Sequence, residues 1–250
     1  TQPAMLTAGV AAFKVYAAQE LPAATVFAGH SLGEYSALVC AGSLQFADAV
    51  KLVAERGRLM QSAVAEGEGA MAAIIGLDDD QVVQACARVE QGVVSAVNFN
   101  SPGQIVIAGN RSSVEQAMAN AKDLGAKRPL PLPVSVPSHC ALMEPAADEL
   151  FQMLESTDIQ MPETPVIHNQ NADVASNPNH IRELLKLQLS NPVLWVNCVT
   201  KMQKMGANTL VEMGPSKVLT GLTRRIDKTL NALAVFDAAS LQQSQQSLQG

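Results

Sequence analysis

Apolar and polar positions near the start of the chain change period twice. Helical spacing predicts a helix over residues 5–19, and Pro22 ends that pattern. A short apolar run at residues 24–28 then predicts a strand that ends at Gly29. Helical spacing resumes at once and predicts a second helix over residues 31–40. The chain therefore opens as helix, strand, sharp turn and helix.

The segment from residue 67 to residue 133 has its own order of strand-like and helix-like stretches. Four short runs of strand character alternate with two amphipathic stretches, in the order β-α-β-β-α-β. That order is the split βαβ arrangement of a ferredoxin-like unit. We expect residues 67–133 to form an inserted subdomain. The predicted strands are 70–76, 93–99, 104–108 and 128–132, and the helices begin near Asp78 and Ser113.

The remainder of the chain again alternates strands with helices, and this predicts a mostly parallel sheet covered on both faces. The predicted fold class is α/β, with residues 1–66 and 134–250 forming the core around the subdomain. A short strand is predicted at 133–136. The Gln- and Ser-rich tail from residue 240 is expected to fray, because it has no clear apolar face.

Composition excludes several function classes. The 250 residues are 48% hydrophobic, which argues against disorder, and the formal net charge is −6. That acidic balance disfavours nucleic acid and anionic membranes as partners, and no run reaches the about 18 apolar residues of a membrane span. The spacing of the four cysteines and four histidines matches neither a disulfide framework nor a metal site. We expect a cytoplasmic protein, active as a monomer, with no metal and no cofactor.

The pentapeptide Gly29-His30-Ser31-Leu32-Gly33 stands between the first predicted strand and the second predicted helix. In that setting a Gly-x-Ser-x-Gly sequence forms a strained turn that exposes the serine oxygen as a nucleophile. The turn also directs backbone N–H groups, including that of Leu32, toward a developing oxyanion. The alternative is that Ser31 is an ordinary helix N-cap residue.

A serine nucleophile needs a base, and His139 is the candidate because it lies on a turn after a predicted strand. Packing within the turn is expected for His30, and loop positions for His168 and His180. No aspartate between Ser31 and His139 stands out as the third member of a triad. A backbone or amide carbonyl could orient the imidazole instead, because the base needs only an acceptor for its second N–H.

Arg56 lies within the apolar arc of a helix predicted over residues 44–64, whereas Arg58 lies on the opposite side. An unpaired buried guanidinium would cost several kcal/mol. Arg56 is therefore predicted to meet an anion. That anion is either a substrate carboxylate held over Ser31 or an acidic side chain in a structural ion pair.

Taken together, these stretches resemble the malonyl-CoA:acyl carrier protein transacylase family along nearly the whole chain. Several separate motifs occur in the family's order, which makes the resemblance specific. They are Gly29–Tyr35, Ala54–Met60, Val97–Gln104, Val134–Cys140, Asn191–Trp195 and Glu212–Pro215.

The resemblance implies a hydrolase-like α/β core that carries a ferredoxin-like insert. It implies that Ser31 takes the malonyl group as an ester, that His139 is general base and then general acid, and that Arg56 pairs with the malonyl carboxylate. It also implies that the main-chain carbonyl of Gln188 orients His139. The leucine at position 32 is similar to that of malonyl-selecting relatives.

Two asparagines, Asn98 and Asn100, match a family loop near the cleft. The family also begins with a strand and a loop whose glutamine completes the oxyanion hole, and we expect that segment to be missing ahead of Thr1. Its loss would remove one oxyanion donor.

The implied activity is ping-pong transfer of a malonyl group from malonyl-CoA to the phosphopantetheine thiol of acyl carrier protein, for fatty acid chain elongation. Alternatives are a serine esterase or thioesterase, an acyltransferase domain fragment of a polyketide synthase, and a non-catalytic scaffold. Because carrier proteins are acidic, a basic patch is expected near the cleft. Its candidates, each of which could equally be plain solvated charge, are Lys201, Lys204, Lys217, Arg224 and Arg225.

Overall fold

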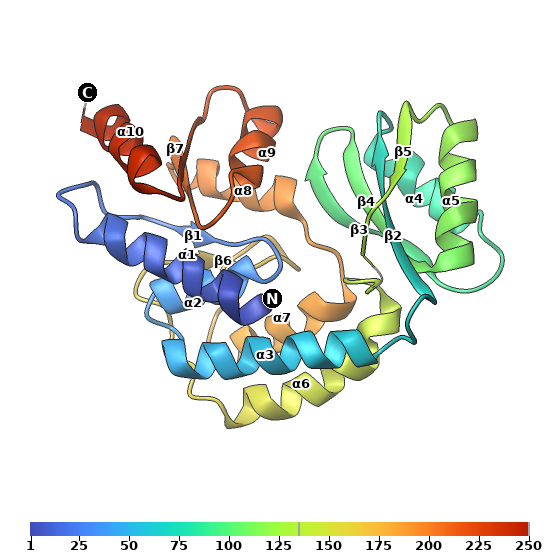
Figure 1. Ribbon diagram of the computed structural model, residues 1–250, viewed down its shortest axis with the longest axis horizontal. Helices are drawn as coiled ribbons and strands as arrows, with labels where there is room; N and C mark the ends of the chain where they lie inside the picture. The colour runs from blue at the N-terminus through green and yellow to red at the C-terminus, as the bar shows by residue number, and fades with distance from the viewer. Residues whose placement is uncertain (135, 250) are drawn as a thin grey trace.

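The computed structural model describes residues 1–134 and 136–249, which form a larger and a smaller lobe (Figure 1). The helices are α1 (Gln2–Ala17), α2 (Gly33–Cys40), α3 (Phe46–Ser62), α4 (Asp79–Ala87), α5 (Arg111–Asp123), α6 (Glu144–Ser156), α7 (Pro178–Ser190), α8 (Trp195–Lys204), α9 (Val218–Ile226) and α10 (Ala238–Gln249), with a 3-10 turn η1 (Ala141–Met143). The strands are β1 (Phe27–Ala28), β2 (Gly69–Ile75), β3 (Val94–Ser101), β4 (Gln104–Asn110), β5 (Arg128–Pro131), β6 (Val166–Ile167), β7 (Thr209–Met213) and β8 (Asn231–Val235).

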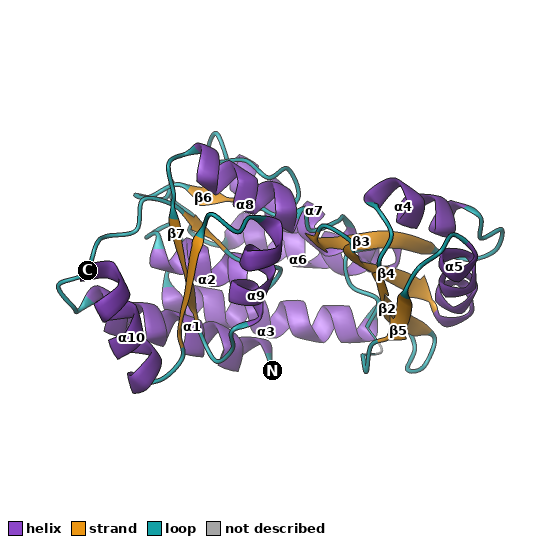
Figure 2. Ribbon diagram, turned by 90° about the horizontal axis from the view of Figure 1, so that it is seen from above, coloured by secondary structure: helices purple, strands orange, loops and turns teal. Residues whose placement is uncertain are grey.

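The smaller lobe has the β-α-β-β-α-β order that its sequence predicts. Its antiparallel sheet has the strand order β3-β4-β2-β5, and α4 and α5 cover the face turned away from the larger lobe (Figure 2). Asp78 begins α4 with a capping box, because its side chain accepts from the Gln81 N–H and the Gln81 side chain accepts from the Asp78 N–H. The other face of the sheet packs on Cys140 and Leu142 of the larger lobe.

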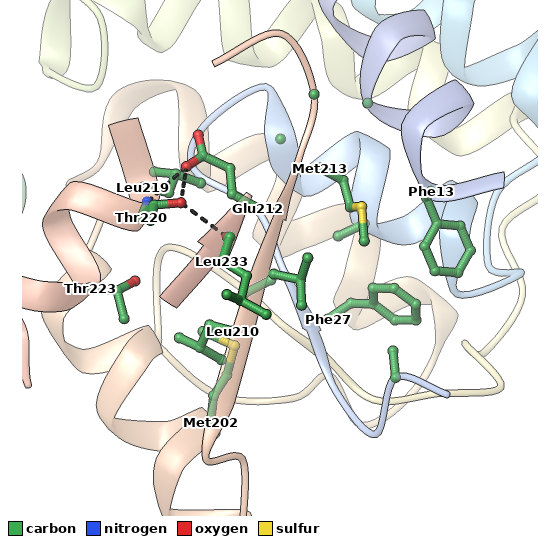
Figure 3. Close-up of a pocket in the computed structure, with 18 of the residues that line it drawn as sticks. Phe13, Phe27, Met202, Leu210, Glu212, Met213, Leu219, Thr220, Thr223 and Leu233 are labelled. Atoms are coloured by element: carbon green, nitrogen blue, oxygen red, sulfur yellow. Dashed lines mark hydrogen bonds between the residues drawn. The ribbon is translucent and has the colours of Figure 1, made fainter. Parts of the chain in front are cut away.

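The parallel strands of the larger lobe form two separate pairs, β1 with β6 and β7 with β8, where the sequence predicted one mostly parallel sheet. β1 is only two residues long, because Ala24 and Thr25 at the start of the apolar run are exposed. An apolar cavity of about 800 Å³ lies between β1 and β7 (Figure 3). Phe27 of β1 and Leu210 of β7 both line it. The sequence pattern identified the strands but not this separation.

Two further predictions about the larger lobe need correction. The tail expected to fray is the helix α10, which packs on β8 and buries Ser240 and Ser244. Small hydroxyl side chains allow this approach, since the Ser244 hydroxyl donates to the Ala234 carbonyl at 3.3 Å. The strand expected at 133–136 is not formed at residues 133, 134 and 136, and residue 135 lies outside the described residues.

The core beneath the site is formed by α2, α3, α6 and α7. Its fully buried side chains include Leu38, Leu52, Leu150 and Leu185, and the partly buried Leu32 packs against them. This packing fixes the start of α2, where the pentapeptide lies. In the described part of the chain, every helix is too short or too polar to cross a lipid bilayer.

Candidate active site

The pentapeptide forms a tight turn between the end of β1 and the start of α2. Ser31 has a φ of 53°, which is uncommon for a residue with a side chain. A Cβ at Gly29 would lie 2.0 Å from the Gly33 carbonyl group, so only glycine fits at position 29. The turn is therefore a strained strand-to-helix elbow that presents the Ser31 hydroxyl at its apex.

His139 meets Ser31 across 108 residues of sequence. The Ser31 Oγ and His139 Nε2 atoms are 2.8 Å apart, and the His139 side chain is buried. The His139 backbone also has a positive φ of 66°, and its N–H donates to the Leu189 carbonyl at 2.9 Å. The imidazole is thus held where it can take the hydroxyl proton.

The other imidazole nitrogen, His139 Nδ1, lies 2.6 Å from the Gln188 carbonyl oxygen. That carbonyl is free to accept because Gln188 lies in the last turn of α7, where carbonyls have no partner inside the helix. Donation from Nδ1 leaves Nε2 as the acceptor that faces Ser31. No aspartate is needed at this position.

The pKa of His139 is lowered from its ordinary value near 6.5 to about 3, mainly by burial and also by the nearby Arg56 charge. The hydrogen bond to the Gln188 carbonyl opposes part of this shift. Burial also lowers the pKa of the neighbouring His30. His139 is therefore neutral, and able to accept a proton, throughout the pH range above its shifted value.

The first prediction concerns pH. We expect the reaction of Ser31 with phenylmethanesulfonyl fluoride, followed by intact mass, to lose less than about threefold in rate between pH 8 and pH 5. A histidine with an ordinary pKa would lose about 30-fold over the same range. Between pH 6.5 and 3 the unfolded chain binds a proton at His139 that the folded chain does not. The free energy of unfolding should therefore decrease as the pH is lowered through that window. Circular dichroism at each pH therefore serves as the control, and an acid limb near pH 6.5 in folded protein would contradict the expectation.

Arg56 is buried on the inner face of α3, as its place on the helix predicts. Its Nη2 atom donates to the Ser31 hydroxyl oxygen and to the Gln188 side-chain oxygen, each at 3.0 Å, and its Nη1 atom donates to the Gln2 side-chain oxygen at 2.8 Å. Among the described residues no acidic side chain lies within salt-bridge distance of Arg56. The guanidinium is thus a buried cation, next to the nucleophile, without an ionic partner.

Backbone donors at the elbow are not equivalent. The Ser31 N–H is used, because it donates to the Asn169 side-chain oxygen at 2.7 Å. The Leu32 N–H has no acceptor within the described residues and lies at the N-terminal end of α2. It is the backbone group available to an oxyanion beside Ser31, where the helix dipole also favours negative charge.

The two candidate asparagines of β3 differ in their contacts. Asn100 is buried, and its side-chain oxygen lies 2.8 Å from His30 Nε2. The His30 ring also lies 5.5 Å from that of Trp195, in agreement with a packing role within the elbow. Asn98 is half-buried, and its side-chain oxygen has no hydrogen-bond partner in the part of the chain described. Asn100 therefore joins the elbow, and Asn98 does not touch it through a hydrogen bond.

Sequence reasoning missed a buried polar group behind the elbow. His168 lies in a loop after β6, as expected, but it is buried and lies 2.7 Å from a carboxylate oxygen of Glu34. His180, also expected in a loop, lies instead in the first turn of α7, beside Ser176. Asn169 is fully buried beside His168 and Glu34. The available signal was Glu34, the only charged residue of a mostly apolar helix, three residues after Ser31.

The basic candidates are mostly exposed, but three of them are already engaged. Lys201 pairs with Asp173 at 2.8 Å, Arg224 donates to the Ala232 carbonyl at 3.1 Å, and Arg225 donates to the Gln104 side-chain oxygen at 2.5 Å. Lys204 and Lys217 are exposed. The basic patch that would meet an acidic carrier protein stays a prediction.

The large cavity is not where this chemistry lies. Its lining includes His30 and Leu32 but not Ser31, Arg56 or His139. Within the described residues no group of three or more metal-ligating side chains comes together. Among the described residues, the arrangement is a buried serine–histidine pair with one backbone donor that lacks an acceptor and one cation that lacks an ionic partner. It can carry out acyl transfer to and from Ser31, with selection for an anionic acyl group.

Comparison with known proteins identifies acyltransferases, both among family models and among individual relatives. Residues 1–247 match the family described as "Acyl transferase domain". The malonyl CoA-acyl carrier protein transacylase of Escherichia coli K12 is 55% identical over 96% of this chain and 78% of its own length.

Solved structures are equally similar. An acyl carrier protein S-malonyltransferase from Vibrio cholerae superposes with a TM-score of 0.95 at 55% identity, covering 97% of this chain and 80% of the other. A malonyl-transacylase in complex with a type II polyketide synthase acyl-carrier protein superposes with a TM-score of 0.96 at 51% identity, covering 98% and 80%.

Proposed function

The chain belongs to the acyl transferase domain family, and from that premise we propose that it transfers the malonyl group of malonyl-CoA to the phosphopantetheine thiol of acyl carrier protein. The observation that carries the proposal is Arg56, a buried guanidinium that has no ionic partner among the described residues and lies 3.0 Å from the Ser31 hydroxyl oxygen. A site that accepted only neutral acyl groups would have no use for such a cation, because burying it unpaired costs free energy.

In the first half-reaction Ser31 Oγ attacks the thioester carbonyl carbon and passes its proton to His139 Nε2. The Gln188 carbonyl stabilises the imidazolium through Nδ1, and the Leu32 N–H donates to the oxyanion. The carbon–sulfur bond then breaks, and the coenzyme A sulfur takes the proton from His139. The product of this step is a malonyl ester on Ser31.

In the second half-reaction the thiol of the carrier's phosphopantetheine arm gives its proton to His139 and attacks the ester carbonyl. The proton returns to Ser31 Oγ as the ester bond breaks. Arg56 holds the malonyl carboxylate through both half-reactions. The carboxylate oxygens replace the Gln2 oxygen on Nη1 and the Ser31 oxygen on Nη2, so the two terminal nitrogens form the donor fork that a carboxylate accepts. Fixing both ends of the acyl group favours an aligned thiol over water.

The finer fold assignment belongs to the same proposal. Residues 1–66 and 134–250 are assigned to a hydrolase-like core, and residues 67–133 to a ferredoxin-like subdomain. The elbow after a parallel strand supports the first assignment, and the strand order β3-β4-β2-β5 supports the second. Asn98 and Asn100 come from that subdomain, and Asn100 meets His30 of the elbow at 2.8 Å.

The proposed reaction needs no cofactor beyond the coenzyme A thioester, which is its substrate. We place it in fatty acid chain elongation, in the cytoplasm, with a monomeric enzyme. The four cysteines are all free thiols, which suits a reducing compartment.

The second prediction separates transfer from hydrolysis. With labelled malonyl-CoA, we expect one malonyl group per chain by intact mass, and its release to holo acyl carrier protein to exceed its release to water. Acetyl-CoA at the same concentration should load Ser31 much more slowly, because it offers no carboxylate to Arg56. Equal loading by both thioesters, or release mainly to water, would instead support the esterase or thioesterase.

A further inference from the structure

The side-chain amide of Asn169 forms hydrogen bonds with the elbow at Ser31 and at Gly29, and these two bonds form the Asn169 clamp. The Asn169 side-chain oxygen accepts the Ser31 N–H at 2.7 Å, and its side-chain nitrogen donates to the Gly29 carbonyl at 2.8 Å. The contact follows from strand pairing. Ala28 of β1 and Ile167 of β6 are partners in a parallel register, so the residues that follow the two strands lie side by side.

The elbow needs such a partner. At a φ of 53°, Ser31 leaves the strand ladder before the helix has begun, so the groups on either side of it lack secondary-structure partners. Gly29 is buried, and an unpaired polar group there would cost about 1–3 kcal/mol. Asn169 is itself fully buried and satisfies an acceptor and a donor of the turn at once.

Asn169 is in turn held by a buried carboxylate. Glu34 Oε2 accepts from the Asn169 N–H at 3.0 Å and from the Gln188 side-chain nitrogen at 2.8 Å, and Glu34 Oε1 lies 2.7 Å from His168 Nδ1. Glu34 and Gln188 are both fully buried. Gln188 also supplies the carbonyl that orients the base and the side-chain oxygen that accepts from Arg56. One carboxylate therefore connects the supports of the nucleophile, the base and the cation.

We propose that Asn169 is a positioning residue for acyl transfer, whose carboxamide holds Ser31 at its reactive angle while Glu34 holds Asn169. No acidic side chain contacts His139 among the described residues. Glu34 instead holds the residues that support Ser31 and His139. Because Asn169 occupies the Ser31 N–H, the oxyanion is left to the Leu32 N–H. The proposal rests on the proposed function only in taking malonyl-CoA as the substrate. The positioning of Ser31 by Asn169 would hold for any acyl group.

The third prediction tests the clamp with Asn169→Ala, Asn169→Asp and a matched control, Asn110→Ala. Asn110 also accepts a backbone N–H through its side-chain oxygen, from Val93 at 2.8 Å, but lies in the smaller lobe. We expect Asn169→Ala to lower kcat for malonyl transfer about 10²-fold with KM nearly unchanged, because small displacements of a reacting atom cost about that much. Asn169→Asp keeps the acceptor for Ser31 and should fall between Asn169→Ala and the parent chain, and Asn110→Ala should leave kcat unchanged.

Labelling of Ser31 by phenylmethanesulfonyl fluoride gives a readout that needs no malonyl-CoA. It should slow in the same order as kcat, so a failed clamp and a failed substrate assignment are distinguishable. Thermal unfolding of each variant shows whether it is folded, and Asn169→Asp still decides if Asn169→Ala does not fold. The proposal is overturned if Ser31 labelling in a folded Asn169 variant stays within twofold of the parent, or if Asn110→Ala slows it equally.

Discussion

Ser31→Ala is expected to abolish formation of the malonyl-enzyme and to lower the rate of transfer at least about 10⁴-fold, the scale seen when a catalytic serine is removed. The reason is geometric, because no other hydroxyl or thiol of the described residues accepts or donates a hydrogen bond with His139 Nε2. Intact mass after incubation with malonyl-CoA checks the first expectation, and the transfer of label to holo acyl carrier protein checks the second.

His139→Ala is the matched variant, because it keeps the hydroxyl and removes its base. We expect slow loading of Ser31 to persist there, assisted by the Leu32 N–H and Arg56, whereas Ser31→Ala should show none. Imidazole added to the medium can enter the space of the missing side chain and restore part of the rate. An adduct on Ser31→Ala that is as large as that on the parent chain would remove Ser31 from the mechanism.

Local patterns predicted the elements better than their assembly. The smaller lobe was predictable in order because each strand and helix carries its own period and Asp78 marks a helix start. The separation of β1 from β7 could not be predicted, because a short apolar run does not reveal which distant strand it pairs with. The tail was also misjudged, since its buried face consists of Ser240 and Ser244 rather than large apolar residues.

The sequence likewise predicted some residues of the site and not others. Ser31 was visible because glycines at fixed spacing surround it, and Arg56 because a cation inside an apolar arc conflicts with its surroundings. The Gln188 carbonyl came only from the family resemblance, because a backbone group leaves no signature in the side chains. The Asn169 clamp could not be inferred, since it joins residues 138 positions apart and depends on the register of two parallel strands.

Arg56→Ala is expected to lower kcat/KM for malonyl-CoA by about 10²- to 10³-fold while changing that for acetyl-CoA far less, because a buried charged hydrogen-bond partner of the substrate carboxylate is lost. Malonyl-CoA should then load Ser31 no faster than acetyl-CoA. Thermal unfolding is the control, because the variant removes an unpaired buried cation but also leaves a cavity and three acceptors without their donor. Initial rates of Ser31 acylation with each thioester measure the ratio.

Two further variants identify which property of Arg56 matters. Arg56→Lys keeps the charge but not the two-nitrogen fork, so it should recover only part of the selectivity if the carboxylate is held by both terminal nitrogens. Arg58→Ala removes an exposed arginine of the same helix, which pairs with Glu55, and should leave both rates unchanged. If Arg56→Ala lowered both thioesters equally, the residue would act by supporting Ser31 and Gln188, its two contacts at 3.0 Å, and the anionic substrate would have to be recognised elsewhere.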